Sequence, residues 1–151
     1  MDELADLVDV FATRVRDIQR RHEMLLGDDP WAALTVPRPA LRLRIEQELR
    51  NHQLRLRRAE VLSDGPGRVR QLVIAAGALR HDLALLEDLA GAPVPDAVAA
   101  AAATRLELPV VDVRAVLRFG RGAAPDAPPP FAAAGRLLER AVALVNAMEA
   151  P

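Results

Sequence analysis

The sequence predicts an all-α fold: an antiparallel, up-and-down bundle of five to six helices. Apolar residues recur at three- and four-residue spacing through most of the chain, which is the spacing of one helical face. Glycine and proline interrupt that spacing where helices would end. Hydrophobic residues make up 51% of the 151 positions, enough for one domain to bury a core.

The single predicted domain, residues 1–151, has three parts. Residues 1–37 are expected to form an amino-terminal helix and an Asp-Pro turn, residues 38–91 a central helical hairpin, and residues 92–151 the carboxy-terminal helices. No repeat period is visible in the sequence, which disfavours a solenoid.

Two long antiparallel helices are expected in the central hairpin. The first is entered through Pro37 and Pro39 and runs from Ala40, because proline suits the first turn of a helix. The second, from Arg68 to Leu89, is apolar over so much of its circumference that it belongs in the middle of the bundle. A turn at Asp64-Gly65-Pro66-Gly67 joins them, and Gly91 ends the second helix. The apolar face of the first helix comprises Leu41, Ile45, Leu49, His52, Leu56 and Ala59. The second has one apolar stripe of Val69, Leu72, Val73, Ala76, Leu79, Leu83, Leu86 and Ala90, and a partial one of Ile74, Ala78, Leu85 and Leu89.

The amino-terminal segment is expected to be one amphipathic helix from Asp2 to Leu26, ended by Gly27. A strand at Val10–Arg16 is the alternative, although apolar and polar residues alternate poorly there. The run Gly27-Asp28-Asp29-Pro30-Trp31 is typical of a turn, because proline keeps the residue before it out of the helical region. The apolar face of the helix comprises Leu4, Leu7, Val8, Phe11, Val15, Ile18, His22 and Leu25.

Three shorter helices are expected after Gly91. The first, Ala97–Leu106, has an alanine run of high helix propensity and follows Asp96, a capping residue. The second begins at Pro109 and is closed by Gly120. Residues 121–130, which include three consecutive prolines, are expected to form an exposed, partly extended connection to the last helix, Phe131–Met148.

Composition argues against several classes of function. The net charge is −1, and all 20 basic residues are arginine, a bias that a GC-rich bacterial gene produces without nucleic-acid binding. One tryptophan, three phenylalanines and no tyrosine give poor support to a nucleic-acid surface. The absence of cysteine excludes disulfides and thiolate chemistry, and a single serine, Ser63, argues against a serine hydrolase.

A cytoplasmic location, without membrane association, is expected. Met1-Asp2-Glu3-Leu4 lacks the basic start and apolar run of a signal peptide. No apolar stretch approaches the roughly 20 residues that a membrane span needs.

Metal binding is not expected. Adjacent Asp28 and Asp29 before a proline are typical of a turn, and Glu46 and Glu48 point to different faces of a helix. The three histidines, His22, His52 and His81, lie on three different predicted helices, and no two have the spacing of a ligand pair within one helix. No cofactor is expected either.

Four runs of residues occur in an order that is similar to that of a known family. The runs are Asp17-Ile18-Gln19-Arg20-Arg21-His22, then Gly27-Asp28-Asp29-Pro30-Trp31-Ala32-Ala33-Leu34, then Leu41 to Arg50, and finally the terminator Leu89-Ala90-Gly91-Ala92-Pro93-Val94-Pro95. This order resembles the carboxy-terminal half of bacterial nucleotidyltransferase-domain proteins of the minimal, kanamycin-nucleotidyltransferase-like kind. The resemblance implies an antiparallel helical domain that binds a substrate or a partner.

The catalytic half of that family is missing from this sequence. The family's core has a Gly-Ser turn and an Asp-x-Asp pair, whose carboxylates hold the magnesium ions. Neither motif occurs in this chain. We therefore expect a non-catalytic substrate-binding or partner-binding domain that transfers no nucleotide by itself.

A ribonuclease is the alternative. Arg16 and His22, with five residues between them, fit the Arg-x(4 to 6)-His spacing of helical HEPN-type ribonucleases, which often partner minimal nucleotidyltransferases. Such a pair would supply a guanidinium to grip phosphate and a general base. In that family the motif usually lies on a late helix, whereas here it lies on the first.

The chain is expected to act with a partner, either as a homodimer or with a separate nucleotidyltransferase core protein. In the family, the amino-terminal segment would lie beside the catalytic core, so its apolar face lacks a cover here. Large exposed apolar patches are uncommon on monomers. The expected contact residues are Phe11, Val15, Ile18 and Trp31. A purely structural dimerisation bundle is the remaining alternative.

Overall fold

The chain is described by a computed structural model that covers residue 8 and residues 10–91, 98–121 and 128–148. Its helices are α2 (Ala12–Arg21), α3 (Arg38–Leu62), α4 (Gly65–Leu89), α5 (Val98–Leu106), α6 (Val110–Phe119) and α7 (Phe131–Ala147). No strand occurs in the part of the chain covered, and α2 replaces the alternative strand at Val10–Arg16. The all-α prediction is confirmed.

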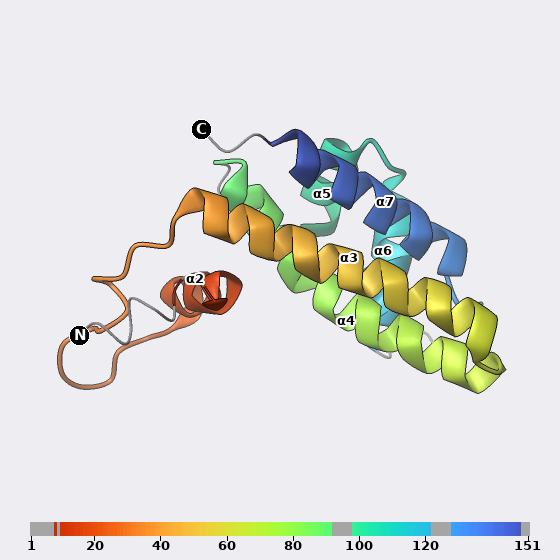
Figure 1. Ribbon diagram of the computed structural model, residues 1–151, viewed down its shortest axis with the longest axis horizontal. Helices are drawn as coiled ribbons and strands as arrows, with labels where there is room; N and C mark the ends of the chain where they lie inside the picture. Colours follow the sequence, from red (N-terminus) through yellow and green to blue (C-terminus); the bar gives the residue numbers. More distant parts are fainter. Residues whose placement is uncertain (1–7, 9, 92–97, 122–127, 149–151) are drawn as a thin grey trace.

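The long helices α3 and α4 lie side by side and run in opposite directions (Figure 1). α4 contacts every other described helix, as its wide apolar surface predicted. The burial is greatest in its second half, where each residue from Asp82 to Glu87 is buried. Nearer the turn, Val73 and Ile74 are exposed, so only part of the predicted circumference is covered.

The turn between α3 and α4 is shorter than predicted. Only Ser63 and Asp64 separate the helices, and α4 begins at Gly65 rather than at Arg68. The reason is a side-chain cap: Asp64 Oδ1 accepts a hydrogen bond from the backbone N–H of Gly67 at 2.7 Å. Pro66 then lies in the first turn of α4, where a proline is tolerated.

The helix predicted to reach Leu26 ends instead at Arg21. His22 adopts an extended backbone conformation, and the following loop folds back along α2 because Gln19 Nε2 donates to the carbonyls of Trp31 and Leu34, at 2.9 and 2.7 Å. These side-chain bonds compete with continuation of the helix.

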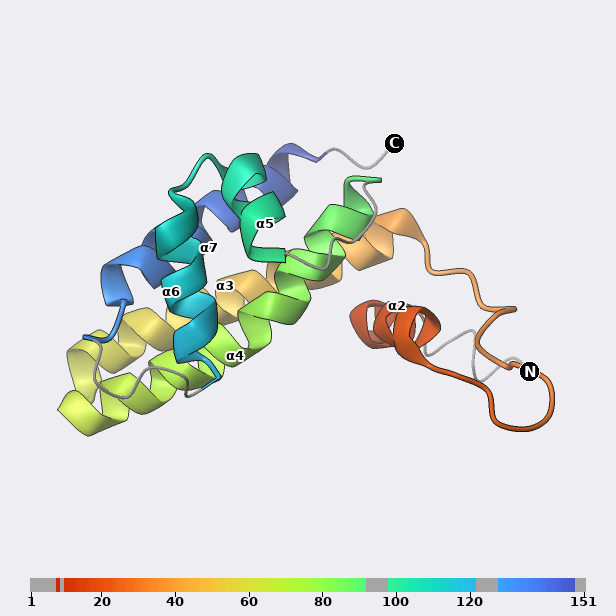
Figure 2. The same cartoon turned by 180° about the vertical axis from the view of Figure 1, so that it is seen from behind.

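The residues beyond the end of α2 are exposed. Leu25 and Leu26, predicted to be helical, have 93% and 91% of their surface exposed, and the loop bulges away from the bundle (Figure 2). Gly27 lies within this loop with a φ of +80°, the left-handed conformation that favours glycine.

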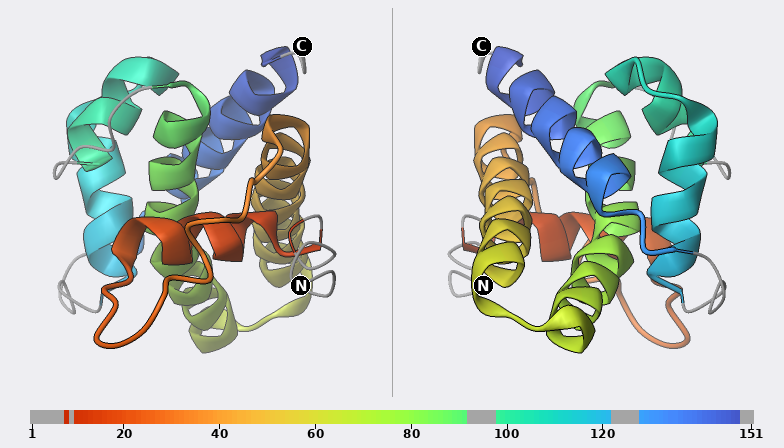
Figure 3. Two further views of the ribbon diagram at one scale, coloured as in Figure 1. Left: turned by 90° about the vertical axis from the view of Figure 1, so that its left-hand side faces the viewer. Right: turned by 90° about the vertical axis from the view of Figure 1, so that its right-hand side faces the viewer.

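α2 lies across α3 and α4 (Figure 3), near the end of the hairpin that is farthest from the turn (Figure 1). Its buried residues are Ala12, Thr13 and Val15. The helices α5, α6 and α7 pack on a different side of the hairpin (Figures 1 and 2).

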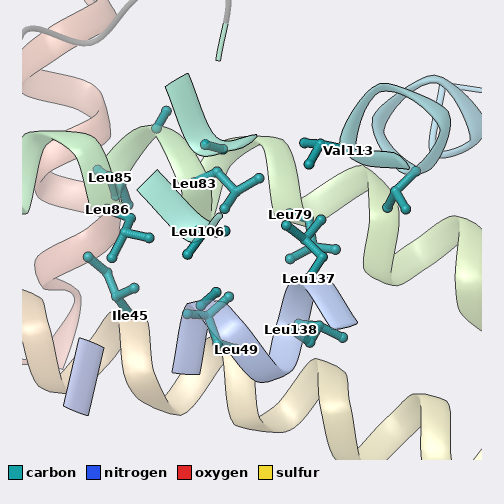
Figure 4. Close-up of a cluster of buried hydrophobic side chains, with 14 of the residues drawn as sticks. Ile45, Leu49, Leu79, Leu83, Leu85, Leu86, Leu106, Val113, Leu137 and Leu138 are labelled. Carbon is teal, nitrogen blue, oxygen red and sulfur yellow. The ribbon is translucent and has the colours of Figure 1, made fainter. Parts of the chain in front are cut away.

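One cluster of buried apolar side chains joins α3 to α7 (Figure 4). Removing this surface from water is the main favourable contribution to folding. Its labelled members are Ile45 and Leu49 of α3, Leu79, Leu83, Leu85 and Leu86 of α4, Leu106 of α5, Val113 of α6, and Leu137 and Leu138 of α7.

The remaining helix ends agree closely with the predictions. Pro109 and Gly120 flank α6, and Gly91 follows α4 with a φ of +73°. The predicted cap Asp96, with Ala97, and residues 122–127 of the proline-rich connection lie outside the described residues.

Gly120 is required by a close approach between two helices. Its φ of −60° suits any residue, so conformation does not explain the glycine. A Cβ at Gly120 would lie 2.5 Å from the backbone N of Gly77 and 2.5 Å from the carbonyl carbon of Ala76, both in α4. Backbone atoms cannot move aside as a flexible side chain would.

We therefore predict that Gly120→Ala lowers the free energy of unfolding by about 1–3 kcal/mol, because α6 must move away from α4. Urea denaturation would measure the change. The control is Gly135→Ala in α7, where an added Cβ meets no neighbouring atom within 4 Å. That substitution should leave stability unchanged or raise it by up to about 1 kcal/mol. Equal stability of the two variants would contradict the role of the close approach.

Candidate functional site: a polar cavity between three helices

A cavity of about 560 Å³ lies between α2, α3 and α4. Its size falls in the range of small-molecule sites, but its lining is unusually polar. It is lined by Arg14, Asp17 and Arg21 of α2, by Glu48, Asn51, His52 and Arg55 of α3, and by Gly77, Ala78, His81 and Asp82 of α4.

The deepest charged group in the cavity is the carboxylate of Asp82. Its side chain is only 2% exposed, and Oδ2 lies 3.3 Å from His52 Nε2 without the geometry of a hydrogen bond. Oδ2 therefore has no hydrogen-bond partner among the described residues. His52 Nδ1 and His81 Nε2 are buried and unpartnered in the same way. Such atoms are uncommon in folded proteins because their desolvation is costly.

Glu48 is a second carboxyl group near Asp82. Its Oε1 accepts a hydrogen bond from Thr13 Oγ1 of α2 at 2.8 Å. Burial raises the pKa of Glu48, and the charge of Asp82 together with a side-chain hydrogen bond between the two carboxyl groups raises it further, against the opposing effects of Thr13 and Arg44. The cavity thus places two carboxyl groups where ionised forms disfavour one another.

His81 faces Asp17 across the α2–α4 contact, with 3.3 Å between Nδ1 and Oδ1. Burial lowers the pKa of His81, and the positive charges of Arg21 and Arg14 add to that effect, while Asp17 and Asp82 oppose it. The lowered pKa favours the neutral form of the His81 imidazole, which reduces the positive charge that it offers to the carboxyl groups.

Arginines surround the mouth of the cavity. Arg21 pairs with Asp17, with 2.8 Å between Nε and Oδ1. Arg14 and Arg55 are exposed and form no ion pair within the part of the chain that the structure describes. Their guanidinium groups are available to an anion that enters the cavity.

The predicted ribonuclease pair lies in a separate cavity of about 410 Å³, where Arg16 and His22 are both lining residues. Arg16 Nε and Nη2 donate to the two carboxylate oxygens of Asp88 at 2.6 and 2.8 Å, and this hydrogen bonding raises the pKa of Arg16. His22 Nε2 lies 2.8 Å from Asp29 Oδ2, and Nδ1 lies 2.7 Å from the carbonyl of Ile18. Both residues are thus engaged in contacts that hold α2 and its loop.

The predicted contact residues differ in exposure. Phe11 is 44% exposed, whereas Val15 is 3% exposed and is covered by the chain itself. Ile18 and Trp31 are half-buried. The partner contact at these residues remains a prediction, but Val15 needs no partner to cover it.

Other candidate residues have structural partners. Asp29 Oδ1 accepts from the backbone N–H of Trp31 at 2.9 Å, which confirms the predicted turn. Glu46 accepts from Arg50 one helical turn away, at 2.8 Å. Within residues 10–91, 98–121, 128–148 and residue 8, no three His, Asp or Glu side chains are grouped to hold a metal ion. None of the described helices is long and apolar enough to cross a membrane.

Sequence reasoning missed the cavity residues. His52 was assigned to the apolar face of α3, yet its ring lines the polar cavity beside Asp82. Glu48 was considered as a metal ligand and rejected, yet it is partly buried against Thr13, 35 positions away in sequence. The available signal was the presence of two adjacent titratable residues, His81 and Asp82, in the part of α4 that carries its apolar stripes.

No protein-family model, curated protein or solved structure matches the chain. The function is therefore argued from the geometry of the cavity.

The two histidines provide a test of the electrostatics. Hydrogen bonding to Asp29 raises the pKa of His22, whereas burial lowers that of His81. We predict that NMR titration finds His22 protonating at a higher pH than His81. The contribution of the His22–Asp29 contact to stability is present below the ordinary histidine pKa and is lost as the pH rises through the raised value.

Asp29→Asn should return the pKa of His22 toward its ordinary value, because the partner charge is removed. The matched control is Asp28→Asn, since Asp28 makes no side-chain contact with His22. Equal effects of the two substitutions on the titration of His22 would contradict this assignment.

Proposed function

We propose that this chain is a non-catalytic substrate-binding helical domain of the bacterial cytoplasm, similar to the accessory half of a nucleotidyltransferase. In this proposal the ligand binds in the cavity between α2, α3 and α4. The single observation that supports it is the buried carboxylate of Asp82, a residue that lines the cavity and whose Oδ2 lacks a hydrogen-bond partner.

The surroundings of Asp82 favour a ligand site over a packing defect. Natural folds rarely leave several buried polar atoms unpartnered around one space. Here His52 Nδ1 and His81 Nε2 share the cavity with Asp82. Perturbed titratable groups gathered in a cleft are typical of binding and catalytic sites.

The hydrogen-bond partners of the candidate side chains favour the binding proposal over the ribonuclease alternative. Arg16 and His22 each have close partners in Asp88 and Asp29. A general base needs a free ring nitrogen within reach of the proton that it removes. The groups of the α2–α3–α4 cavity, in contrast, still have unused hydrogen-bonding capacity.

To test the proposal, the cavity is filled by Ala78→Phe, because Ala78 lines it from α4. The control is Ala115→Phe on an exposed position of α6, outside the cavity. The probes are a panel of small polar compounds: amino acids, amines, sugars, nucleosides and phosphorylated amines. Ligand-observed NMR should detect at least one binder for the wild type.

We predict that Ala78→Phe weakens this binding at least tenfold, because the added ring occupies the ligand's space, and that Ala115→Phe does not. Circular dichroism would verify that both variants are folded. Failure of every compound to bind the wild type, or binding that persists in folded Ala78→Phe, would contradict the proposal.

A partner contact is the second candidate function, and the exposure of Leu25 and Leu26 favours it. We propose that a second copy of the chain covers this loop, or a separate core protein when one is present. Adjacent apolar side chains gain free energy when a partner removes them from water.

We predict that the double substitution Leu25→Asp with Leu26→Asp converts a wild-type dimer to monomer in light scattering. The control is Val61→Asp with Leu62→Asp, an apolar pair at the far end of α3 that is also exposed, by 80% and 69%. A monomeric wild type, or dimers lost equally in both variants, would exclude this contact.

A further inference from the structure

We infer that the ligand of this cavity is a small zwitterion, with an ammonium group held between Asp82 and Glu48 and a phosphate or carboxylate held by Arg14 and Arg55. The inference rests on the proposed function, because it assigns the chemistry of the molecule that the same cavity binds.

Three acidic residues in the second half of α4 provide an internal comparison. Glu87 is buried, and both of its oxygens accept hydrogen bonds from Arg105 of α5, each at 2.8 Å. Asp88 is paired in the same bidentate manner with Arg16 of α2. Asp82 is as buried as Glu87, yet no arginine reaches it and its Oδ2 has no hydrogen-bond partner. The fold supplies an arginine to two of these carboxylates, whereas the third has the His52 imidazole at 3.3 Å.

A cation from the ligand would complete this third pair. A buried carboxylate is stable only when it is paired and hydrogen-bonded. An ammonium group offers three N–H donors, which suits a site with more than one free acceptor. Asp82 Oδ2 is one such acceptor, and the carboxyl group of Glu48 lies beside it. Burial of Glu48 raises its pKa, as expected where negative charge lacks compensation.

The protein's own cations do not fill this role. Burial lowers the pKa of His81 and so favours its neutral form, and the arginines of the lining are exposed rather than deep. His52 Nε2 approaches Asp82 Oδ2 only at 3.3 Å and without hydrogen-bond geometry. A metal ion is disfavoured because no three carboxylate or imidazole groups are suitably arranged within the described ranges.

The mouth of the cavity has the opposite charge. Arg14 and Arg55 line it from α2 and α3, and the planar guanidinium group binds phosphate and carboxylate through two parallel hydrogen bonds. From Arg50 to Arg70 the sequence contains six arginines and two acidic residues, although the whole chain has a net charge of −1. This local excess favours an anionic group at the Arg55 side of the mouth.

The burial of these charged groups predicts the orientation of the ligand in the cavity. Asp82 is buried and Glu48 is half-buried, whereas the guanidinium groups are exposed, so the ammonium end enters first and the acidic end stays near solvent. A molecule with only one of these charges would leave either the deep carboxylate or the arginines without a partner.

The inference is tested by isothermal titration calorimetry with four probes. O-phosphoethanolamine and β-alanine are zwitterions that distinguish phosphate from carboxylate. Ethanolamine is the cation alone, and inorganic phosphate is the anion alone. We expect one zwitterion to bind the wild type at least tenfold more tightly than either single charge.

Two substitutions locate the two ends of the bound molecule. Asp82→Asn keeps the shape of the side chain and removes its charge, and Arg55→Gln removes a guanidinium at the mouth. Each should weaken zwitterion binding at least tenfold. Arg114→Gln, on an exposed part of α6, is the control and should change nothing. If Asp82→Asn fails to fold, Glu48→Gln replaces it with the same expected loss.

The outcomes separate this inference from the proposed function. Equal binding of ethanolamine or phosphate alone would overturn the zwitterion while the cavity remained a ligand site. Absence of binding by all four probes would also overturn the zwitterion, and the compound panel with Ala78→Phe would then decide the proposed function independently. The inference would also be overturned if Asp82→Asn and Arg55→Gln fold and still bind the zwitterion as tightly as the wild type does.

Discussion

The burial of α4 by its neighbours is the constraint on which the rest of the structure depends. Because α4 contacts every other described helix, its second half is removed from water on nearly all sides. Any charged residue there needs a partner from a neighbouring helix. Arg105 and Arg16 meet this need for Glu87 and Asp88, and these pairs fix α5 and α2 against α4. No arginine pairs with Asp82, and the cavity lies beside this residue.

The position of α2 creates that cavity. α2 contributes little apolar surface to the core, since Ala12 alone of its residues belongs to the main buried cluster. Polar contacts instead hold it across the hairpin, through Thr13 to Glu48 and Arg16 to Asp88. A helix attached in this way leaves space between its polar side chains and those of α3 and α4.

Sequence patterns predicted the fold better than the site. The spacing of Leu41, Ile45 and Leu49 was enough to orient α3, because apolar burial follows helical periodicity. The end of α2 was wrong because it depends on Gln19 reaching the carbonyls of a loop, which periodicity does not encode. The site could not be predicted either, since Glu48 and His52 acquire their environment only when α2 crosses α3 and α4.

The central claim is that a ligand supplies the missing partner of Asp82. A crystal structure of the wild type grown with O-phosphoethanolamine tests it most directly. The account predicts the ligand nitrogen within hydrogen-bond distance of Asp82 Oδ2 and the phosphate beside Arg55. An empty cavity in which a protein side chain donates a hydrogen bond to Asp82 Oδ2 would contradict the account.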